Sequence, residues 1–278
     1  MLNRKPLALC LAALFVFCVS GCSESDNDSS GCISLDNFSD RAFGEYAISW
    51  WDLDGDKCIS QSEASQITEI PERAFKNNNT IESIDDLNLF PSITTLREEA
   101  FAGCIKIKTA NLKYIQIVEQ YTFSDTTLTS ISLPKATNVG KGAFKDVSSL
   151  TSVDLPNVET VGGWAFSGTS LESVSLPKAT YVGDGAFYSV STLKTLDLPM
   201  ATNIGEEIVV VYNDYSDKYE ILLDTLYLTS PLPISMSSSS YDIEGYHNTN
   251  LYLNINKKSE VSGVSWNGIE WKSITFVE

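Results

Sequence analysis

The central part of the chain repeats one pattern of apolar and polar positions every 21 or 22 residues. The motif Leu-x-x-Ile/Val-x-Leu-Pro begins at Leu128, Leu150 and Leu171, and each copy is followed by Val-Gly-x-x-Ala-Phe. So short a period, with apolar residues at fixed offsets, is typical of a solenoid in which each repeat packs only against its neighbours. The pattern therefore predicts a mainly β solenoid.

The offsets within a repeat predict one short strand and one turn. The last two apolar residues of Leu-x-x-Ile-x-Leu face the same side of a strand, and stacked strands of this kind build a parallel sheet that ends at the following Pro. Recurring glycines mark a turn on the opposite face of the solenoid, at Gly140, Gly162, Gly183 and Gly205. The Ala-Phe pairs are expected to form an internal column of stacked rings, which includes Phe144, Phe166 and Phe187.

The array has irregular ends. The pattern starts near Ile70, and the first interval, from Phe75 to Phe101, is 26 residues long, as terminal repeats often differ from the rest. Cys104 takes the place that Val occupies in later repeats, so we expect it to be a buried apolar filler.

A helix-loop-helix segment is predicted before the repeats. Between Leu35 and Trp51 the apolar residues fall at three- and four-residue spacings, which indicates an amphipathic helix. A second helical patch covers Ala64 to Ile67. Between the two lies an acidic run from Asp52 to Glu63.

The amino terminus has the composition of an export signal. Arg4 and Lys5 precede an unbroken apolar run from Leu7 to Val19, which is shorter than the roughly 20 residues that a membrane-spanning helix needs. The polar, acidic residues that follow, up to residue 32, have nothing to bury and predict a flexible tether.

Composition and charge limit the possible partners. Hydrophobic residues make up 43% of the chain and charged residues 20%, as in folded proteins. The formal net charge of −17 at pH 7 repels phosphate backbones, so we expect no nucleic-acid partner.

The sequence contains no recognisable catalytic motif, and we expect no enzymatic activity. His247 is the single histidine and is more consistent with a surface residue than with a catalytic base. The paired acids Asp85-Asp86 and Glu206-Glu207 fit solvated turns better than a glycosidase pair. Cys32 and Cys58 could form a disulfide, but the pairing cannot be read from the sequence.

Two features at the amino terminus resemble those of bacterial lipoproteins. Val19-Ser20-Gly21-Cys22 is similar to the lipobox, which implies cleavage before Cys22 and a lipid on its thiol that anchors the protein to the membrane; the alternative is an ordinary secretory signal. The acidic stretch after Cys22 resembles the export signal of Bacteroidetes lipoproteins. This second resemblance implies an outer membrane lipoprotein exposed on the cell surface.

The acidic run resembles an EF-hand or dockerin-type calcium loop. Its carboxylates stand at loop positions 1, 3, 5 and 12, which are Asp52, Asp54, Asp56 and Glu63. The resemblance implies a structural calcium ion with the carbonyl of Cys58 and Ser60 as further ligands. Lys57 departs from the pattern, because position 6 usually holds a Gly with positive φ. The alternative is an acidic turn that binds little metal.

The repeats themselves resemble the BspA-like, or treponemal-type, leucine-rich repeats of bacterial surface antigens. The resemblance covers residues 70 to about 210 and implies a right-handed leucine-rich repeat superhelix, preceded by a small helical EF-hand-like cap. The Leu-x-Leu segments near the end of the chain resemble the family's carboxy-terminal cap. The predicted regions are a signal peptide at 1–21, a tether at 22–32, a helix-loop-helix cap at 33–68, and a repeat domain at 69–278 with its terminal cap from about 210.

Candidate partner-binding residues lie on the outward strand positions and in tyrosine-rich segments near the end of the chain. Short polar side chains on the sheet face suit an extended contact, and Tyr suits recognition loops. Solubility alone would also select small polar residues, and the tyrosines could instead pack the end cap. The candidates are Ser152, Asp154, Ser173, Ser175, Thr195, Asp197, Tyr212, Tyr215, Tyr219 and Tyr227.

The family resemblance implies a surface protein that attaches to host or microbial surface proteins. The sequence leaves a second function open, the capture of glycans for a nutrient uptake system. A broad polar face would favour protein adhesion, whereas exposed aromatic rings gathered in a concave pocket would favour a glycan. An enzyme with an unrecognised site is the third alternative, and a pocket with converging acids would support it.

Overall fold

The computed structural model describes residues 31–209, 211–213, 218–228, 243–244, 250–254, 265–266, 269–270 and 272–277. The chain divides into two units, Met1–Gly31 and Cys32–Glu278, and the description below concerns the second. The predicted signal peptide, the predicted lipidation site Cys22, Tyr215 and His247 lie outside the described residues. No helix within the described ranges is long and apolar enough to cross a membrane.

The helical cap is smaller than the sequence predicted. Helix α1 spans Arg41–Trp51 and is preceded by a 3-10 turn, η1 (Leu35–Asn37), rather than extending to Leu35. The reason is Asp40, whose carboxylate accepts a hydrogen bond from the backbone N–H of Phe43 and begins the helix there. The second helix, α2, is also shifted, to Gln61–Gln66, because Ser60 and Glu63 form a capping box at its start.

Aromatic and buried polar contacts join the cap to the first repeat. The ring of Trp51 lies 4.8 Å from that of Phe90, measured between centroids, and Phe43 lies 5.6 Å from Phe75. Asp86, in the 3-10 helix η2 (Asp85–Leu89), accepts hydrogen bonds from Ser39 and from the backbone N–H of Asp40. Asp86 is only 8% exposed, so the prediction of a solvated turn was wrong for this residue.

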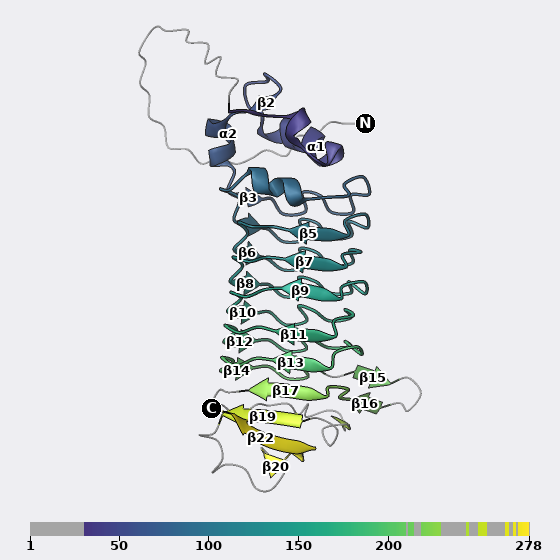
Figure 1. Ribbon diagram of the computed structural model, residues 1–278. Helices are drawn as coiled ribbons and strands as arrows, with labels where there is room; N and C mark the ends of the chain where they lie inside the picture. Colours follow the sequence, from purple (N-terminus) through teal and green to yellow (C-terminus); the bar gives the residue numbers. More distant parts are fainter. Residues whose placement is uncertain are drawn as a thin grey trace. The chain divides into compact units, whose positions relative to one another are not determined.

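The predicted parallel strands form one face of the solenoid, in two sheets of three and five strands (Figure 1). Their apolar central residues are in register, so that Ile131 pairs with Val153, and Val174 with Leu196. The five-stranded sheet continues into the end of the chain, as predicted. The strands are β5 (Thr109–Asn111), β7 (Ser130–Ser132), β9 (Ser152–Asp154), β11 (Ser173–Ser175), β13 (Thr195–Asp197), β17 (Thr225–Leu228), β19 (Asn250–Asn254) and β22 (Ser273–Val277).

A second parallel ladder stands where the sequence predicted turns. Its strands are only two residues long and are β3 (Glu69–Ile70), β4 (Thr95–Leu96), β6 (Ile117–Val118), β8 (Asn138–Val139), β10 (Thr160–Val161), β12 (Tyr181–Val182) and β14 (Asn203–Ile204). The recurring glycines directly follow these strands. A Cβ on Gly140 would lie 2.6 Å from the carbonyl carbon of Glu119, so glycine is required for the close approach of adjacent backbones.

Stacked phenylalanines fill the interior between the two ladders. Neighbouring rings are 5.1 to 5.6 Å apart between centroids and within 8° of parallel, from Phe75 through to Phe187. The predicted column is confirmed. Cys104 is fully buried, as expected, and burial raises the pKa of its thiol to about 11, so the thiol stays protonated near neutral pH.

Shorter elements complete the described structure. Strands β1 (Ile33–Ser34) and β2 (Cys58–Ile59) pair within the cap. Strands β15 (Val211–Asn213), β16 (Lys218–Glu220) and β18 (Ile243–Glu244) form a three-stranded sheet, and β20 (Ser265–Trp266) pairs with β21 (Ile269–Glu270). The solenoid and its parallel sheets confirm the predicted fold class.

Candidate functional site

The acidic loop brings three of its four predicted carboxylates together. Oxygens of Asp52, Asp54 and Glu63 lie within 4.8 Å of one another, a spacing compatible with one shared cation. Asp56 is not part of this group, and one of its oxygens accepts a hydrogen bond of 2.8 Å from the backbone N–H of Cys58. The Asp52 carboxylate accepts hydrogen bonds from the backbone N–H groups of Gly55 and Lys57. These hydrogen bonds fix the shape of the loop.

Lys57 adopts the conformation that calcium loops usually assign to glycine. Its φ is 70°, in the left-handed region, where an L-residue costs on the order of 1–2 kcal/mol. Lys57 therefore keeps the backbone turn of a calcium loop at the cost of backbone strain, and its exposed side chain adds a positive charge to the loop.

Glu63 links the loop to helix α2. Burial by itself would raise the pKa of Glu63, but hydrogen bonds from the N–H groups of Leu53 and Ser60 and from the Ser60 hydroxyl outweigh it and hold the pKa below its usual range. The carboxylate thus remains ionised and available to a cation at neutral pH.

A disulfide joins Cys32 to Cys58, with 5.8 Å between their Cα atoms. Cys58 can therefore offer a cation only its carbonyl oxygen. The bridge closes a loop of 26 residues around helix α1, which in the chain-entropy model stabilises the cap by about 3.5 kcal/mol.

The predicted strand positions form a polar strip on β9, β11, β13 and β17, which we call the strand face. Apart from Tyr227, its members carry short hydroxyl or carboxylate side chains, on either side of an apolar residue that is buried in β11, β13 and β17 and half-buried in β9. Ser152, Asp154, Ser173 and Ser175 are exposed, whereas Thr195, Asp197 and Tyr227 are half-buried.

Serine hydroxyls of the preceding strands hold the two acids of the strand face. Ser132 donates a hydrogen bond of 2.7 Å to Asp154, and Ser175 donates one of 2.8 Å to Asp197. Asp154 in β9 and Asp197 in β13 lie two repeats apart, in the three-stranded and the five-stranded sheet respectively. The strand face therefore carries two fixed negative charges on a rigid support.

The tyrosine segments are only partly described. Tyr212 in β15 and Tyr219 in β16 are partners in an antiparallel pair, so they occupy the same position along this hairpin. Neither of these tyrosines belongs to the sheets that bear the strand face. Tyr227 does, because it lies in β17 and pairs with Asp197 of β13.

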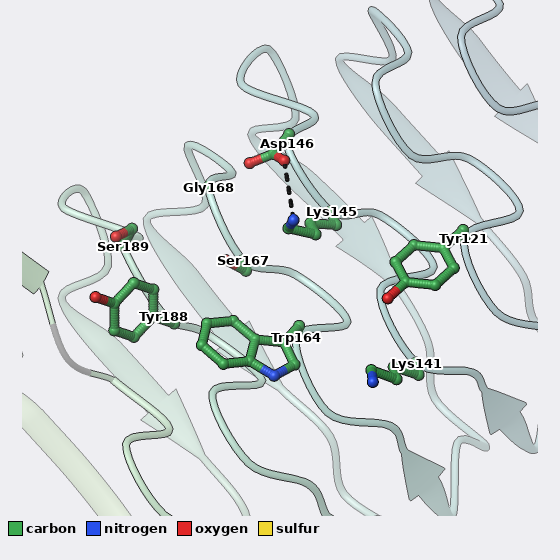
Figure 2. Close-up of a pocket in the computed structure, with 9 residues that line it drawn as sticks. All are labelled: Tyr121, Lys141, Lys145, Asp146, Trp164, Ser167, Gly168, Tyr188 and Ser189. Carbon is green, nitrogen blue, oxygen red and sulfur yellow. Dashed lines mark ion pairs between the residues drawn. The ribbon is translucent and has the colours of Figure 1, made fainter.

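An open cavity of about 440 Å³ lies in the turns after the second ladder, where the sequence predicted no site (Figure 2). Its aromatic residues are Tyr121, Trp164 and Tyr188. The sequence holds only a local signal for it, at the position two residues before the column phenylalanine, where four successive repeats alternate an aromatic residue with glycine: Tyr121, Gly142, Trp164 and Gly185.

Comparison with protein families identifies the repeats. The chain matches the family described as BspA type leucine rich repeat region in six copies, over residues 56–135 and 116–210, which together are more than half of its length. A comparison with curated proteins gives no match.

Several solved structures are similar to this one. A leucine-rich repeat protein from Bacteroides ovatus is 20% identical, with a TM-score of 0.47 over 77% of this chain and 59% of its own. A leucine rich cell surface protein from Faecalibacterium prausnitzii is 16% identical, with a TM-score of 0.44 over 77% of this chain and 78% of its own. The chain thus spans less than two thirds of the Bacteroides protein that it matches.

Proposed function

This chain belongs to the BspA-type leucine-rich repeat family, and from that premise we propose that it is a non-enzymatic binding protein of the cell surface. Repeat proteins of this architecture bind partners along extended, rigid surfaces. The proposed partner is a host or bacterial surface protein, and the proposed contact is the strand face.

The observation that carries this proposal is the pair of fixed acids on the strand face. Because serine hydroxyls already orient Asp154 and Asp197, a partner does not have to immobilise them on binding, which lowers the entropic cost of the contact. Two carboxylates two repeats apart, set among small hydroxyl side chains, suit a protein surface with two exposed lysines or arginines at a matching distance.

The test is binding of the soluble mature chain, from residue 23 onward so that the Cys32–Cys58 disulfide is kept, to an array of host matrix and bacterial surface proteins. The double variant Asp154→Asn/Asp197→Asn should weaken binding at least tenfold and reduce its dependence on salt. Glu159→Gln/Glu206→Gln is the matched control, because it removes two exposed acids away from the strand face. Equal loss in both variants, or no protein ligand at all, would contradict adhesion through this face.

We propose that a lipid on Cys22 anchors the protein in the outer membrane, exposed at the cell surface. The lipobox-like residues before Cys22 and the acidic tether after it support this proposal. Metabolic labelling with a radioactive fatty acid should mark the wild-type protein and not Cys22→Ala. Protection of the wild-type protein from protease added to whole cells would contradict surface exposure.

We propose that the acidic loop binds a structural calcium ion. The convergence of Asp52, Asp54 and Glu63 and the left-handed turn at Lys57 support it, and the carbonyl of Cys58 and Ser60 are the proposed further ligands together with Asp56. Calcium should raise the unfolding temperature relative to chelator, and Asp52→Asn/Asp54→Asn should abolish the increase. An unchanged unfolding temperature in millimolar calcium would overturn the proposal.

A second candidate function is glycan capture, and the aromatic cavity in the turns is the observation that favours it. Its residues are separate from the strand face, so the two functions can be tested independently.

A further inference from the structure

The cavity of Figure 2 is built from the turns of adjacent repeats. Three aromatic rings share it with two lysines, an aspartate and two serine hydroxyls. The lining residues are Tyr121, Lys141, Lys145, Asp146, Trp164, Ser167, Gly168, Tyr188 and Ser189. A volume of about 440 Å³ is within the range of small-molecule sites.

Tyr121 and Trp164 stand at a backbone position that bulky residues rarely adopt. In seven successive turns the residue before the Ala-Phe pair, or its equivalent, has φ between 53° and 62°: Arg73, Glu99, Tyr121, Gly142, Trp164, Gly185 and Glu207. Glycine adopts this conformation without a steric cost, whereas a bulky residue there is a rare outlier. Gly142 and Gly185 at the same position show that the turn does not require a large side chain where Trp164 stands.

The conformation places each ring over the glycine of the next turn. A Cβ on Gly185 would lie 3.1 Å from ring atoms of Trp164, and one on Gly142 would lie 2.4 Å from the ring of Tyr121. The backbone at Gly142 and Gly185 therefore supports one face of each ring. Trp164 is half-buried, which leaves part of its indole exposed to the cavity.

Tyr188 and a charged pair complete the lining. The ring centroid of Tyr188 lies 5.0 Å from that of Trp164, and the ring planes meet at 59°. The ammonium of Lys145 lies 3.5 Å from a carboxylate oxygen of Asp146, as the dashed line in Figure 2 shows. The cavity thus combines angled, fixed aromatic faces with exposed donors and acceptors.

We propose that this cavity binds a neutral oligosaccharide through stacking of a pyranose ring on Trp164. The C–H groups on one face of a pyranose pack against an aromatic ring, while hydroxyl groups around its edge both donate and accept hydrogen bonds. Lys145 and Asp146 supply a donor and an acceptor side by side, which suits two adjacent sugar hydroxyls. Tyr188, inclined to Trp164, contacts the neighbouring sugar unit.

Other ligand classes match this lining less well. An apolar peptide side chain gains most from an enclosed hydrophobic pocket, whereas this cavity is open and its lining includes two lysines, an aspartate and two serines. A small anion would meet the carboxylate of Asp146 beside the ammonium groups. A sugar uses the aromatic faces, the charged pair and the open shape together.

The test is calorimetric titration of the full mature chain with neutral trisaccharides of glucose, mannose, galactose and xylose. At least one should bind with a dissociation constant between micromolar and millimolar. Trp164→Gly should reduce its affinity at least tenfold, and Tyr188→Ala several-fold. Tyr181→Ala is the matched control, since Tyr181 is 41% exposed in β12 and does not line the cavity.

The choice of Trp164→Gly separates binding from folding. Glycine is the native residue at this position in the neighbouring turns, so the variant should keep a cooperative unfolding transition and the wild-type circular dichroism spectrum. Binding of none of the four sugars, or equal binding by the wild type and Trp164→Gly, would overturn the proposal. Binding to surface proteins can be measured separately on the same variant, because Trp164→Gly leaves Asp154 and Asp197 of the strand face unchanged.

Discussion

The helical cap and the repeat array are stabilised in different ways. The repeats between residues 128 and 187 rely on a period of apolar side chains, with a ring column and a ladder of two-residue strands that every repeat extends. The cap has no period. It depends on individual polar contacts, such as Asp40 at the start of α1 and Glu63 in the loop, and on a disulfide. Changes in the array should therefore spread to neighbouring repeats, whereas changes in the cap should stay local.

The largest effect is expected from Phe144→Ala. It removes a fully buried ring from the middle of the column and should lower the free energy of unfolding by about 3–5 kcal/mol. Hydrogen exchange should show loss of protection on both sides of residue 144. Tyr181→Ala, at an exposed position of the same region, should change stability by less than about 1 kcal/mol. A loss of protection confined to one repeat would contradict the proposed coupling.

Removing the disulfide with Cys32→Ser/Cys58→Ser should have the next largest effect. The cap should lose about 2–4 kcal/mol of stability, because the open chain around α1 gains conformational freedom when it unfolds. Hydrogen exchange should accelerate in α1 and remain slow in the repeats after residue 128. Loss of protection throughout the array would show that cap and repeats unfold as one unit.

Lys57→Gly should stabilise the cap by about 1 kcal/mol, because glycine adopts the left-handed turn without the steric cost that lysine carries. The same change should tighten calcium binding, since it also removes a positive charge from the loop. Lys57→Ala is the control, which removes the charge and keeps the strain. Thermal unfolding with and without calcium measures both effects, and a less stable Lys57→Gly protein would contradict the first.

The smallest expected effect is a loss of stability at acid pH, which should occur in both the cap and the repeat array. Ion-paired hydrogen bonds with Lys76 and Arg73 hold the pKa of Glu99 below its usual range, and hydrogen bonds hold that of Glu63 below it as well. Their stabilisation is present above the unfolded-state pKa of about 4.3 and is lost as the pH falls through the lower folded-state values.

Glu63→Gln and Glu99→Gln separate the two contributions to this acid sensitivity. Unfolding followed from pH 6 to pH 2 should show a weaker pH dependence in each variant than in the wild type. A wild-type stability that stays constant over this range would contradict the prediction.

The period of the sequence was sufficient to predict the solenoid, its strands and the ring column. The second ladder escaped prediction because strands of two residues, such as β8 and β10, are too short to show an alternation of apolar and polar side chains. In the cap, Asp40 begins the helix later than the apolar spacing indicated, because a single capping side chain outweighs a continuing pattern.

The candidate sites were predictable to unequal extents. The acidic loop and the strand face follow from spacing, since Asp52 and Glu63 stand at fixed loop positions and Asp154 points outward by strand alternation. The aromatic cavity could not be found in this way. The position of Trp164 holds Arg, Glu, Tyr or Gly in other repeats, and what these residues share is a backbone angle rather than a type of side chain.

The nearly constant spacing of the phenylalanine rings also has a consequence for how such a chain changes in length. Because each ring meets the next in the same orientation, loss or duplication of one 21- or 22-residue segment joins two rings that already match. A gene of this kind can gain or lose whole turns by recombination between its own repeats without creating a new packing problem. The length of the solenoid therefore varies in steps of a single turn, each about 5 Å high.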